Sequence, residues 1–238
     1  FQRGIAGTFD DQGAPDPASP FTKFTGAGEL REIGKVKRGV TGTRVRYWVD
    51  SQIFIKGAHV VLDEIQRRAR QTAFLVPGLT IVLLDRREER TPEQSERTVF
   101  HYAGGISEFV DYLAKDQKIT DVIRLTGSGD YTETVPVLDK SGHMVSKDVS
   151  RTCEVDIALR WGADYDTTVR SFVNIVATPK GGTHVTGFEQ ALVKVVRKAV
   201  DAQSRRVKFN AKKEKIEKDD TLAGLTAVVT VRIDEPQF

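Results

Sequence analysis

The side chains that most often bind metals or act as nucleophiles are sparse in this sequence. Cys153 is the only cysteine, so the chain can assemble neither an internal disulfide nor a thiolate zinc site. None of the four histidines has the spacing of metal ligands; they are His59, His101, His143 and His184. The sequence therefore predicts no metal site, and the single cysteine favours a reducing, cytoplasmic setting.

The motif Gly181-Gly182-Thr183-His184 could bind a ligand, because it opens a predicted helix. Free backbone N–H groups and the helix dipole can attract an anion at such a position. Thr183 could instead be the N-cap of the helix, and we interpret the motif as structural. The chain contains no strand-linked G-x-G-x-x-G and no G-x-x-x-x-G-K-[ST], G-x-S-x-G or H-E-x-x-H motif. Common enzyme signatures are therefore missing.

Basic residues are concentrated between positions 205 and 215, a stretch that includes Arg205, Arg206 and Lys208. Acidic residues follow at once, and the whole chain has a net charge of only +3. A dedicated nucleic-acid binder carries a larger, one-sided excess of positive charge. Two interpretations of this stretch stay open: a solvated helix or loop, and a set of phosphate contacts. No apolar run approaches the roughly 18 residues of a membrane helix, so membrane insertion is not expected.

Strands are predicted where apolar residues alternate with polar ones or form short β-branched runs. The strand at 43–49 should be half buried, and the strand at 79–85 should be buried on both faces. The next three strands are expected to pair antiparallel. All predicted strands cover residues 43–49, 79–85, 132–138, 154–161, 167–177 and 224–233.

Helices are predicted where apolar residues recur three or four positions apart, at 58–74, directly after Gly104-Gly105, and at 184–202. The second helix should bury Ile106, Phe109, Val110 and Leu113, and the third should bury Phe188, Leu192, Val195 and Ala199. The order strand, long helix, strand at the end of the chain predicts a right-handed crossover onto the same sheet. A charged stretch with a central proline, residues 86–98, predicts a domain boundary. The mixture of helices with antiparallel strands indicates the α+β class.

Five short blocks of the sequence resemble, in content and order, the ATPase component of bacterial type IIA DNA topoisomerases, that is, DNA gyrase B and its counterpart in topoisomerase IV. Together they span nearly the whole chain. The blocks are T-G-T-x-V-R-Y-W at 41–48, R-Q-T-A-F-L at 70–75, F-H-Y-x-G-G at 100–105, G-G-T-H-x-x-G-F at 181–188 and E-P-Q-F at 235–238.

The resemblance implies an α+β fold in two parts. Residues 1–98 would be the C-terminal part of a GHKL ATPase domain, and residues 99–238 a transducer domain that resembles ribosomal protein S5 domain 2 and is truncated before the Q-T-K loop. The implied function is to couple ATP binding to closure of the N-gate and to DNA strand passage. The full-length protein would use ATP and Mg, form a homodimer, and work with an A/C-type topoisomerase subunit on duplex DNA without sequence preference. Gyrase and topoisomerase IV are not distinguished.

The resemblance also implies site residues. Thr43 would bind adenine or its water, and Val45 would form an apolar wall of the adenine pocket. Sequence-independent DNA contacts are expected from Lys180, Arg205, Arg206 and Lys208. The family's general base, magnesium-binding Asn, glycine-rich lid and γ-phosphate lysine are not recognisable here, so this chain by itself is expected to bind ATP poorly and not to hydrolyse it. The alternatives are a non-catalytic nucleic-acid-binding module with an S5-like fold, and another GHKL-family ATPase.

Overall fold

The computed structural model describes residues 34–47, 53–54, 60–86, 97–138, 141, 143–209 and 215–237. Contacts divide the chain into two compact units, Phe1–Val60 and Val61–Phe238. Helices and strands are both present, which confirms the α+β class. The residues of the second unit form all the helices and strands of the described part of the chain.

In the first unit, the described residues 34–47 contain a turn, in which the N–H of Val40 donates to the carbonyl of Lys37 (3.0 Å), and no helix or strand. Residues 43–47 are exposed, so the predicted half-buried strand at 43–49 is wrong in its described part. A segment with alternating polar and apolar residues forms a strand only when a neighbouring strand pairs with its backbone. Residues 48–49 lie outside the described residues.

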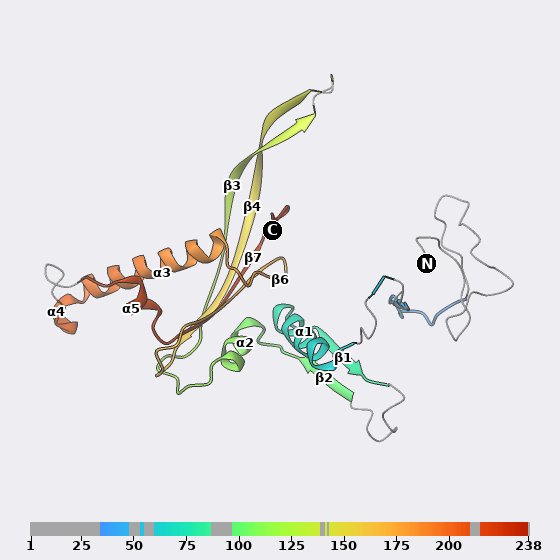
Figure 1. Ribbon diagram of the computed structural model, residues 1–238, viewed down its shortest axis with the longest axis horizontal. Coiled ribbons are helices and arrows are strands. Elements are labelled where there is room, and N and C mark those ends of the chain that lie inside the picture. Colours follow the sequence, from blue (N-terminus) through green and yellow to red (C-terminus); the bar gives the residue numbers. More distant parts are fainter. Residues whose placement is uncertain are drawn as a thin grey trace. The chain divides into compact units, whose positions relative to one another are not determined.

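The second unit is built on a five-stranded sheet in the order β3-β4-β7-β5-β6 (Figure 1). The strands are β3 (Ile123–Leu138), β4 (Met144–Trp161), β5 (Thr168–Val173), β6 (Val176–Ala177) and β7 (Leu225–Arg232). β3 and β4 form an antiparallel hairpin, as predicted. The prediction that the next strand adds antiparallel is wrong, because β7 pairs with β4 and β5 then pairs parallel with β7. The sequence predicted that the strands before and after the long helix belong to one sheet, joined by a crossover. This prediction is confirmed, because β5 and β7 pair parallel.

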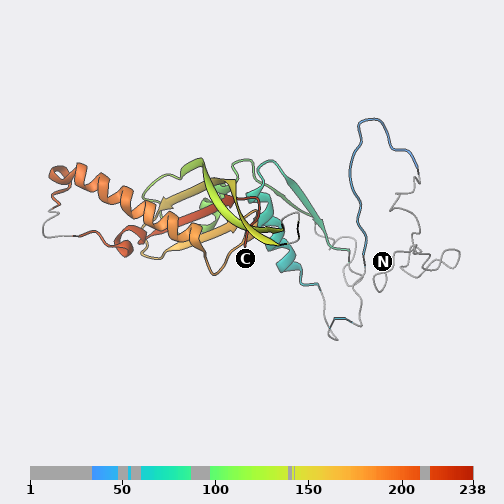
Figure 2. The same cartoon turned by 90° about the horizontal axis from the view of Figure 1, so that it is seen from above.

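Helices cover both faces of this sheet (Figures 1 and 2). On one face, α1 (Leu62–Leu75) and α2 (Ile106–Leu113) pack against the sheet; their core includes Phe74, Phe109 and Val228. On the other face, α3 (Thr183–Ala202) and α5 (Lys218–Leu222) pack around Phe188 and Leu159. The face of α2 that was predicted from its periodicity is confirmed, with Ile106, Phe109 and Val110 all buried.

A second, two-stranded sheet pairs β1 (Thr80–Leu84) with β2 (Arg97–His101). Only one face of β1 is covered, by α1, while Val82 and Leu84 on the other face remain 43% and 45% exposed. The expectation that this strand is buried on both faces is therefore wrong, since only one face meets a helix. The segment predicted as a domain boundary, 86–98, connects β1 to β2 within the second unit. The division into 1–98 and 99–238 thus differs from the compact units and stays a prediction.

The β3–β4 hairpin is longer than the sequence indicated. β7 pairs with β4 only from Glu154 to Trp161, so the ladder that extends from Cys153 to Met144 continues as a two-stranded arm (Figure 1). Within the arm, Arg151 of β4 pairs with Glu133 of β3 (3.2 Å), and it also pairs with Glu235 outside the arm (2.6 Å). Glu235, which follows β7 in the final block of the sequence, therefore contacts the base of the arm.

The buried face of α3 agrees with the predicted one at Phe188 and Leu192 and differs from it further along the helix. Phe188 and Val193 are buried, and Leu192 packs beside them. Val195 is 63% exposed and Ala199 is also exposed, so the prediction is wrong for these two residues. The helix continues past the sheet edge (Figure 2). Its C-terminal turns mainly contact the short helices α4 (Ser204–Val207) and α5. These helices, and not the sheet, therefore decide which side of the C-terminal turns is buried.

We expect Val193→Ala to lower the free energy of unfolding by about 1–2 kcal/mol more than Val195→Ala, because only Val193 loses buried methyl groups. The gain in helix propensity is the same for both variants and cancels in the comparison. Urea denaturation of the two variants measures the difference. Equal stabilities would contradict the observed orientation of α3.

Candidate functional site

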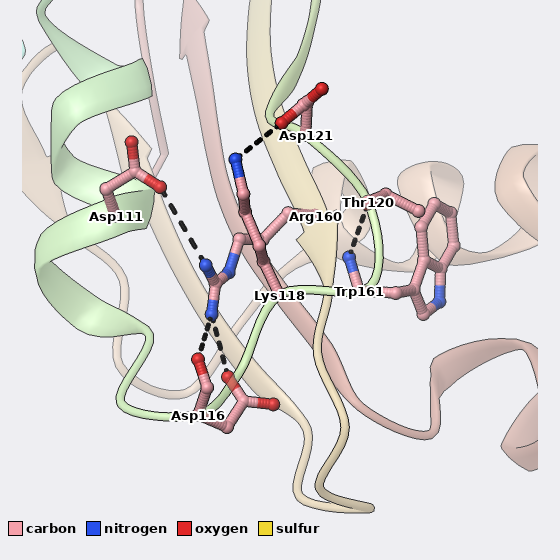
Figure 3. Close-up of polar contacts among 7 residues, drawn as sticks. All are labelled: Asp111, Asp116, Lys118, Thr120, Asp121, Arg160 and Trp161. Carbon is pink, nitrogen blue, oxygen red and sulfur yellow. Dashed lines mark hydrogen bonds and ion pairs between the residues drawn. The ribbon is translucent and has the colours of Figure 1, made fainter.

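A buried arginine organises the end of the sheet next to α2 (Figure 3). The Arg160 Nη2 group on β4 donates 2.8 Å hydrogen bonds to both the carbonyl and the Oδ1 atom of Asp116. Arg160 Nη1 lies 3.9 Å from the carboxylate of Asp111 on α2. The side chains of Arg160 and Asp116 are only 8% and 12% exposed. The pair therefore fixes the connection that follows α2 against the central strand.

Backbone contacts extend this cluster on both sides. The N–H of Asp164 donates to Asp116 Oδ2 (3.1 Å), and the N–H of Trp161 donates to Thr120 Oγ1 (3.0 Å; Figure 3). The pKa of Asp116 lies below its ordinary value, first because of the Asp164 hydrogen bond and then because of Arg160, while partial burial opposes the shift. Both oxygens of Asp116 already have partners. The cluster is thus equipped to hold two loops together rather than to bind a ligand.

Glycine is needed where these loops approach each other. A Cβ atom added at Gly162 would collide with the carboxylate of Asp116. At Gly224, which has φ +72°, a Cβ would lie 2.6 Å from the carbonyl oxygens of Gly162 and Asp164. The N–H of Gly162 donates to the carbonyl of Gly224 (2.9 Å), so the chain passes itself at backbone distance. Both positions permit that approach because glycine lacks a side chain.

Lys180 lies in a hydrogen-bonded turn between β6 and α3. The N–H of Gly181 donates to the carbonyl of Thr178 (2.9 Å), with Pro179 and Lys180 as the central residues. Thr178 also shares hydrogen bonds with Ser171 Oγ (2.7 Å) and His184 Nε2 (3.2 Å). Partial burial lowers the pKa of His184. The turn presents the exposed Lys180 side chain from a fixed backbone.

The glycine-rich motif after this turn acts as a helix start. Gly182 occupies the N-cap position, and Thr183 is the first helical residue. The option of Thr183 as the N-cap is therefore incorrect, since Thr183 is already helical and Gly182 is the non-helical residue before it. Gly182 has no side chain to cap the helix.

The other three predicted DNA contacts lie at the opposite end of α3. Arg205 and Arg206 belong to α4, and Lys208 is its C-cap with a left-handed backbone. All three side chains are exposed. Because α3 has 20 residues, it separates them from Lys180 by about 30 Å at roughly 1.5 Å per residue. The structure therefore places the four residues in two groups and not in one patch.

The predicted nucleotide contacts Thr43 and Val45 lie in the first unit. Both are exposed, and no helix or strand contains them. The two residues are separated by one position in the sequence. Their role in binding adenine stays a prediction.

Within the described residues, no group of three or more His, Cys, Asp or Glu side chains could hold a metal ion. Cys153 is a free, partly buried thiol, and burial raises its pKa. In the same part of the chain, none of the helices is long and apolar enough to cross a membrane.

Sequence reasoning missed Arg160, Asp116 and three arginines that line a cavity of the second unit, Arg67, Arg70 and Arg170. Arg160 directly follows the apolar run 157–159 of β4, and an arginine beside such a run is a usable signal for a buried ion pair. Its partner could not be identified in advance, because Asp116 is 44 residues away in the chain. Asp111, Asp121, Asp164 and Asp166 were equal candidates by residue type.

We expect Gly162→Ala to lower the free energy of unfolding by about 1–3 kcal/mol, because the new methyl group must displace the Asp116 carboxylate. Gly127→Ala is the matched control, since an added Cβ there meets no atom within 4 Å; its effect should stay within about 0.5 kcal/mol. Chemical denaturation monitored by circular dichroism measures both. Equal effects would show that the loops do not depend on this close approach.

The sequence and the structure both match known proteins. A family model described as DNA gyrase B matches residues 105–238. The gyrase B protein of Staphylococcus epidermidis is 34% identical over 211 residues, which cover 88% of this chain and 28% of that protein. The gyrase B protein of Mycolicibacterium smegmatis is 30% identical over 239 residues, covering 89% of this chain and 31% of that protein. The chain thus spans less than a third of these relatives.

Solved structures give the same result. The 43K ATPase domain of Thermus thermophilus gyrase B, crystallised in complex with an aminocoumarin, aligns with 87% of this chain and 49% of its own, with a TM-score of 0.63 and 27% identity. The gyrase B protein of Myxococcus xanthus shares the fold at 20% identity, with a TM-score of 0.52 over 92% of this chain and 51% of its own. Because the family model matches more than half of the residues, the chain belongs to the DNA gyrase B family.

Proposed function

We propose that this chain is the part of an ATP-dependent type II DNA topoisomerase that couples ATP binding to closure of the N-gate and to DNA strand passage. The observation that carries the proposal is the structural match to the ATPase domain of Thermus thermophilus gyrase B over 87% of the chain. The complete protein would work in the cytoplasm as a homodimer, together with an A/C-type subunit. The match favours this function over an S5-like nucleic-acid module or another GHKL-family ATPase.

Coupling requires that ATP favour one arrangement of the ATPase and transducer parts over another. An aromatic cluster supports such a connection. Phe74 on α1, in the proposed ATPase part, stacks on Phe109 of α2 with ring centroids 4.7 Å apart. Phe109 in turn meets Phe172 of β5 at 6.1 Å. A displacement of α1 would therefore press directly on the central sheet, because packed interiors do not deform freely.

The nucleotide chemistry belongs to the complete protein. ATP and Mg would bind there, with Thr43 and Val45 as this chain's contributions to the adenine pocket. A threonine hydroxyl can both donate and accept a hydrogen bond, which suits an adenine edge or its bound water. The chain alone is expected neither to hydrolyse ATP nor to dimerise upon ATP addition, because the base, the magnesium ligand and the γ-phosphate lysine are not recognisable in its sequence.

The coupling proposal predicts that, in the complete protein assembled with its A/C-type partner, Phe74→Leu lowers ATP-driven strand passage several-fold while ATP affinity stays unchanged. The substitution keeps an apolar residue but removes the ring that bridges α1 and α2. Relaxation or supercoiling of plasmid DNA and equilibrium titration of an ATP analogue give the two readouts.

The control for this experiment is Val193→Ala, which removes buried methyl groups from α3, outside the aromatic cluster. It should leave strand passage intact. If both variants lose activity in proportion to their stability, the cluster only stabilises the fold. Strand passage by the unmodified complex without ATP would refute the proposed function itself.

DNA contacts are proposed for Lys180, Arg205, Arg206 and Lys208, through phosphates and without sequence preference. Their separation into two groups suits a duplex that lies along α3 and touches both ends. We compare a triple Ala variant of Arg205, Arg206 and Lys208 with Lys180→Ala. The triple variant should reduce the salt dependence of duplex binding more than Lys180→Ala does. Each lost phosphate contact should lower the slope of log K against log salt by about 0.9.

Lys118→Ala is the control for the DNA experiment, because Lys118 already pairs with Asp121 at 2.7 Å. Fluorescence anisotropy with a labelled duplex at several salt concentrations measures the slopes. Binding that does not respond to ionic strength, or that is equally weakened by the control, would exclude these contacts.

A further inference from the structure

A cavity of about 640 Å³ lies between α1, α2, β5 and the turn before α3. Its charged lining residues are all cationic: Arg67, Arg70, Arg170 and Lys180. No Asp or Glu is among its described lining residues. Four positive charges around one cavity repel each other, so the arrangement is most stable when an anion enters. The cations come from three separate regions of the chain, and only the fold brings them together.

Arg70 is held in place before any ligand binds. Its Nη1 group donates to the hydroxyl of Tyr112 (2.8 Å). Its guanidinium also lies over two aromatic rings, 5.5 Å from the centroid of Phe100 and 5.2 Å from that of Tyr112. The tyrosine satisfies one of five N–H donors, so the remaining fork can bind a planar or tetrahedral anion. A fixed guanidinium loses little side-chain entropy when a ligand arrives.

The other cations are free to bind. Within the described part of the chain, neither Arg170 nor Lys180 forms an ion pair or a side-chain hydrogen bond. Arg67 has one acidic neighbour, Glu64, at 3.8 Å, but both side chains are more than two-thirds exposed. Such a solvated pair contributes little. Arg170 lies on the same strand face as Phe172, which packs against α2, and the backbone of Lys180 belongs to the hydrogen-bonded turn that begins at Thr178.

We propose that this cavity is a binding site for a small anion that carries phosphate groups, such as pyrophosphate or the phosphates of a nucleotide. Its volume is within the range of small-molecule sites, roughly 300–1,000 Å³. Guanidinium groups bind phosphate oxygens in pairs, and a lysine adds a point charge. The ring of Tyr112 and the side chain of Phe109 line the same cavity and supply an apolar wall.

The site is independent of the proposed strand-passage function. Only Lys180 is shared with the proposed DNA contacts, while Arg67, Arg70 and Arg170 are specific to the cavity. The same phosphate chemistry could come from a free anion or from a DNA backbone. A duplex can present a single phosphate at the opening of the cavity, whereas a free pyrophosphate can reach all four cations. We therefore assign the cavity to the free anion.

The test is calorimetric titration of pyrophosphate into the chain at low ionic strength. The expected result is binding of one pyrophosphate per chain. The double variant Arg70→Gln/Arg170→Gln should weaken this binding at least tenfold. The matched control, Arg205→Gln/Arg206→Gln, removes the same two charges at the far end of α3 and should change the affinity less than twofold. Absence of pyrophosphate binding, or equal weakening by both double variants, would overturn the proposal.

A parallel titration with a short duplex separates the two sources of phosphate. If the cavity takes a free anion, the duplex should not displace pyrophosphate, and Arg70→Gln/Arg170→Gln should leave duplex affinity nearly unchanged. Full competition would assign the cavity to backbone phosphates instead and refute the free-anion site. Circular dichroism melting checks each fold. If Arg70→Gln lowers the melting temperature, the single variant Arg170→Gln carries the same test, because the Arg170 side chain has no partner among the described residues.

Discussion

The pairing of Arg160 with Asp116 is the constraint on which the organisation of the second unit depends. A guanidinium that is 8% exposed cannot remain charged in a sheet interior without compensation. Asp116 supplies that compensation with its carboxylate and its backbone carbonyl, so the segment after α2 must lie against the end of β4. That requirement holds α2 on one face of the sheet. It also forces the neighbouring loops so close together that glycine is needed at 162 and 224.

With α2 held in this way, the aromatic side chains of α1, α2 and β5 form one continuous core. This core crosses the division at residue 98 that the family resemblance implies, which makes it suited to transmit a change from the ATPase part to the sheet. The position of β7 between β4 and β5 determines the packing on the other face of the sheet. It makes β7 the central, fully paired strand, so α3 packs against the most rigid part of the sheet.

The same packing distributes the positive charges. α1 and the turn before α3 are distant in sequence, yet both line the cavity that holds Arg70 and Lys180. At the other end of α3, Arg205 and Arg206 remain on the surface. The fold thus separates a set of cations that line one cavity, which suits a small anion, from a set on the open surface, which suits a long polyanion. Both sets of cations attract a negatively charged ligand, but their geometries suit ligands of different size.

The sequence by itself determined the α+β class, the position of α2 and its buried face, the approximate positions of α1 and α3, and the family, because periodicity and short motifs are local properties. It did not determine the order of the strands, the burial of β1, or which residues in the second half of α3 face inward. Those depend on which partner covers each element. The Arg160–Asp116 pair and the cavity around Arg70, Arg170 and Lys180 join residues far apart in the chain. Only the tertiary structure brings these residues together. Contacts between distant residues depend on how helices pack on both faces of the sheet, and no local sequence pattern specifies that packing.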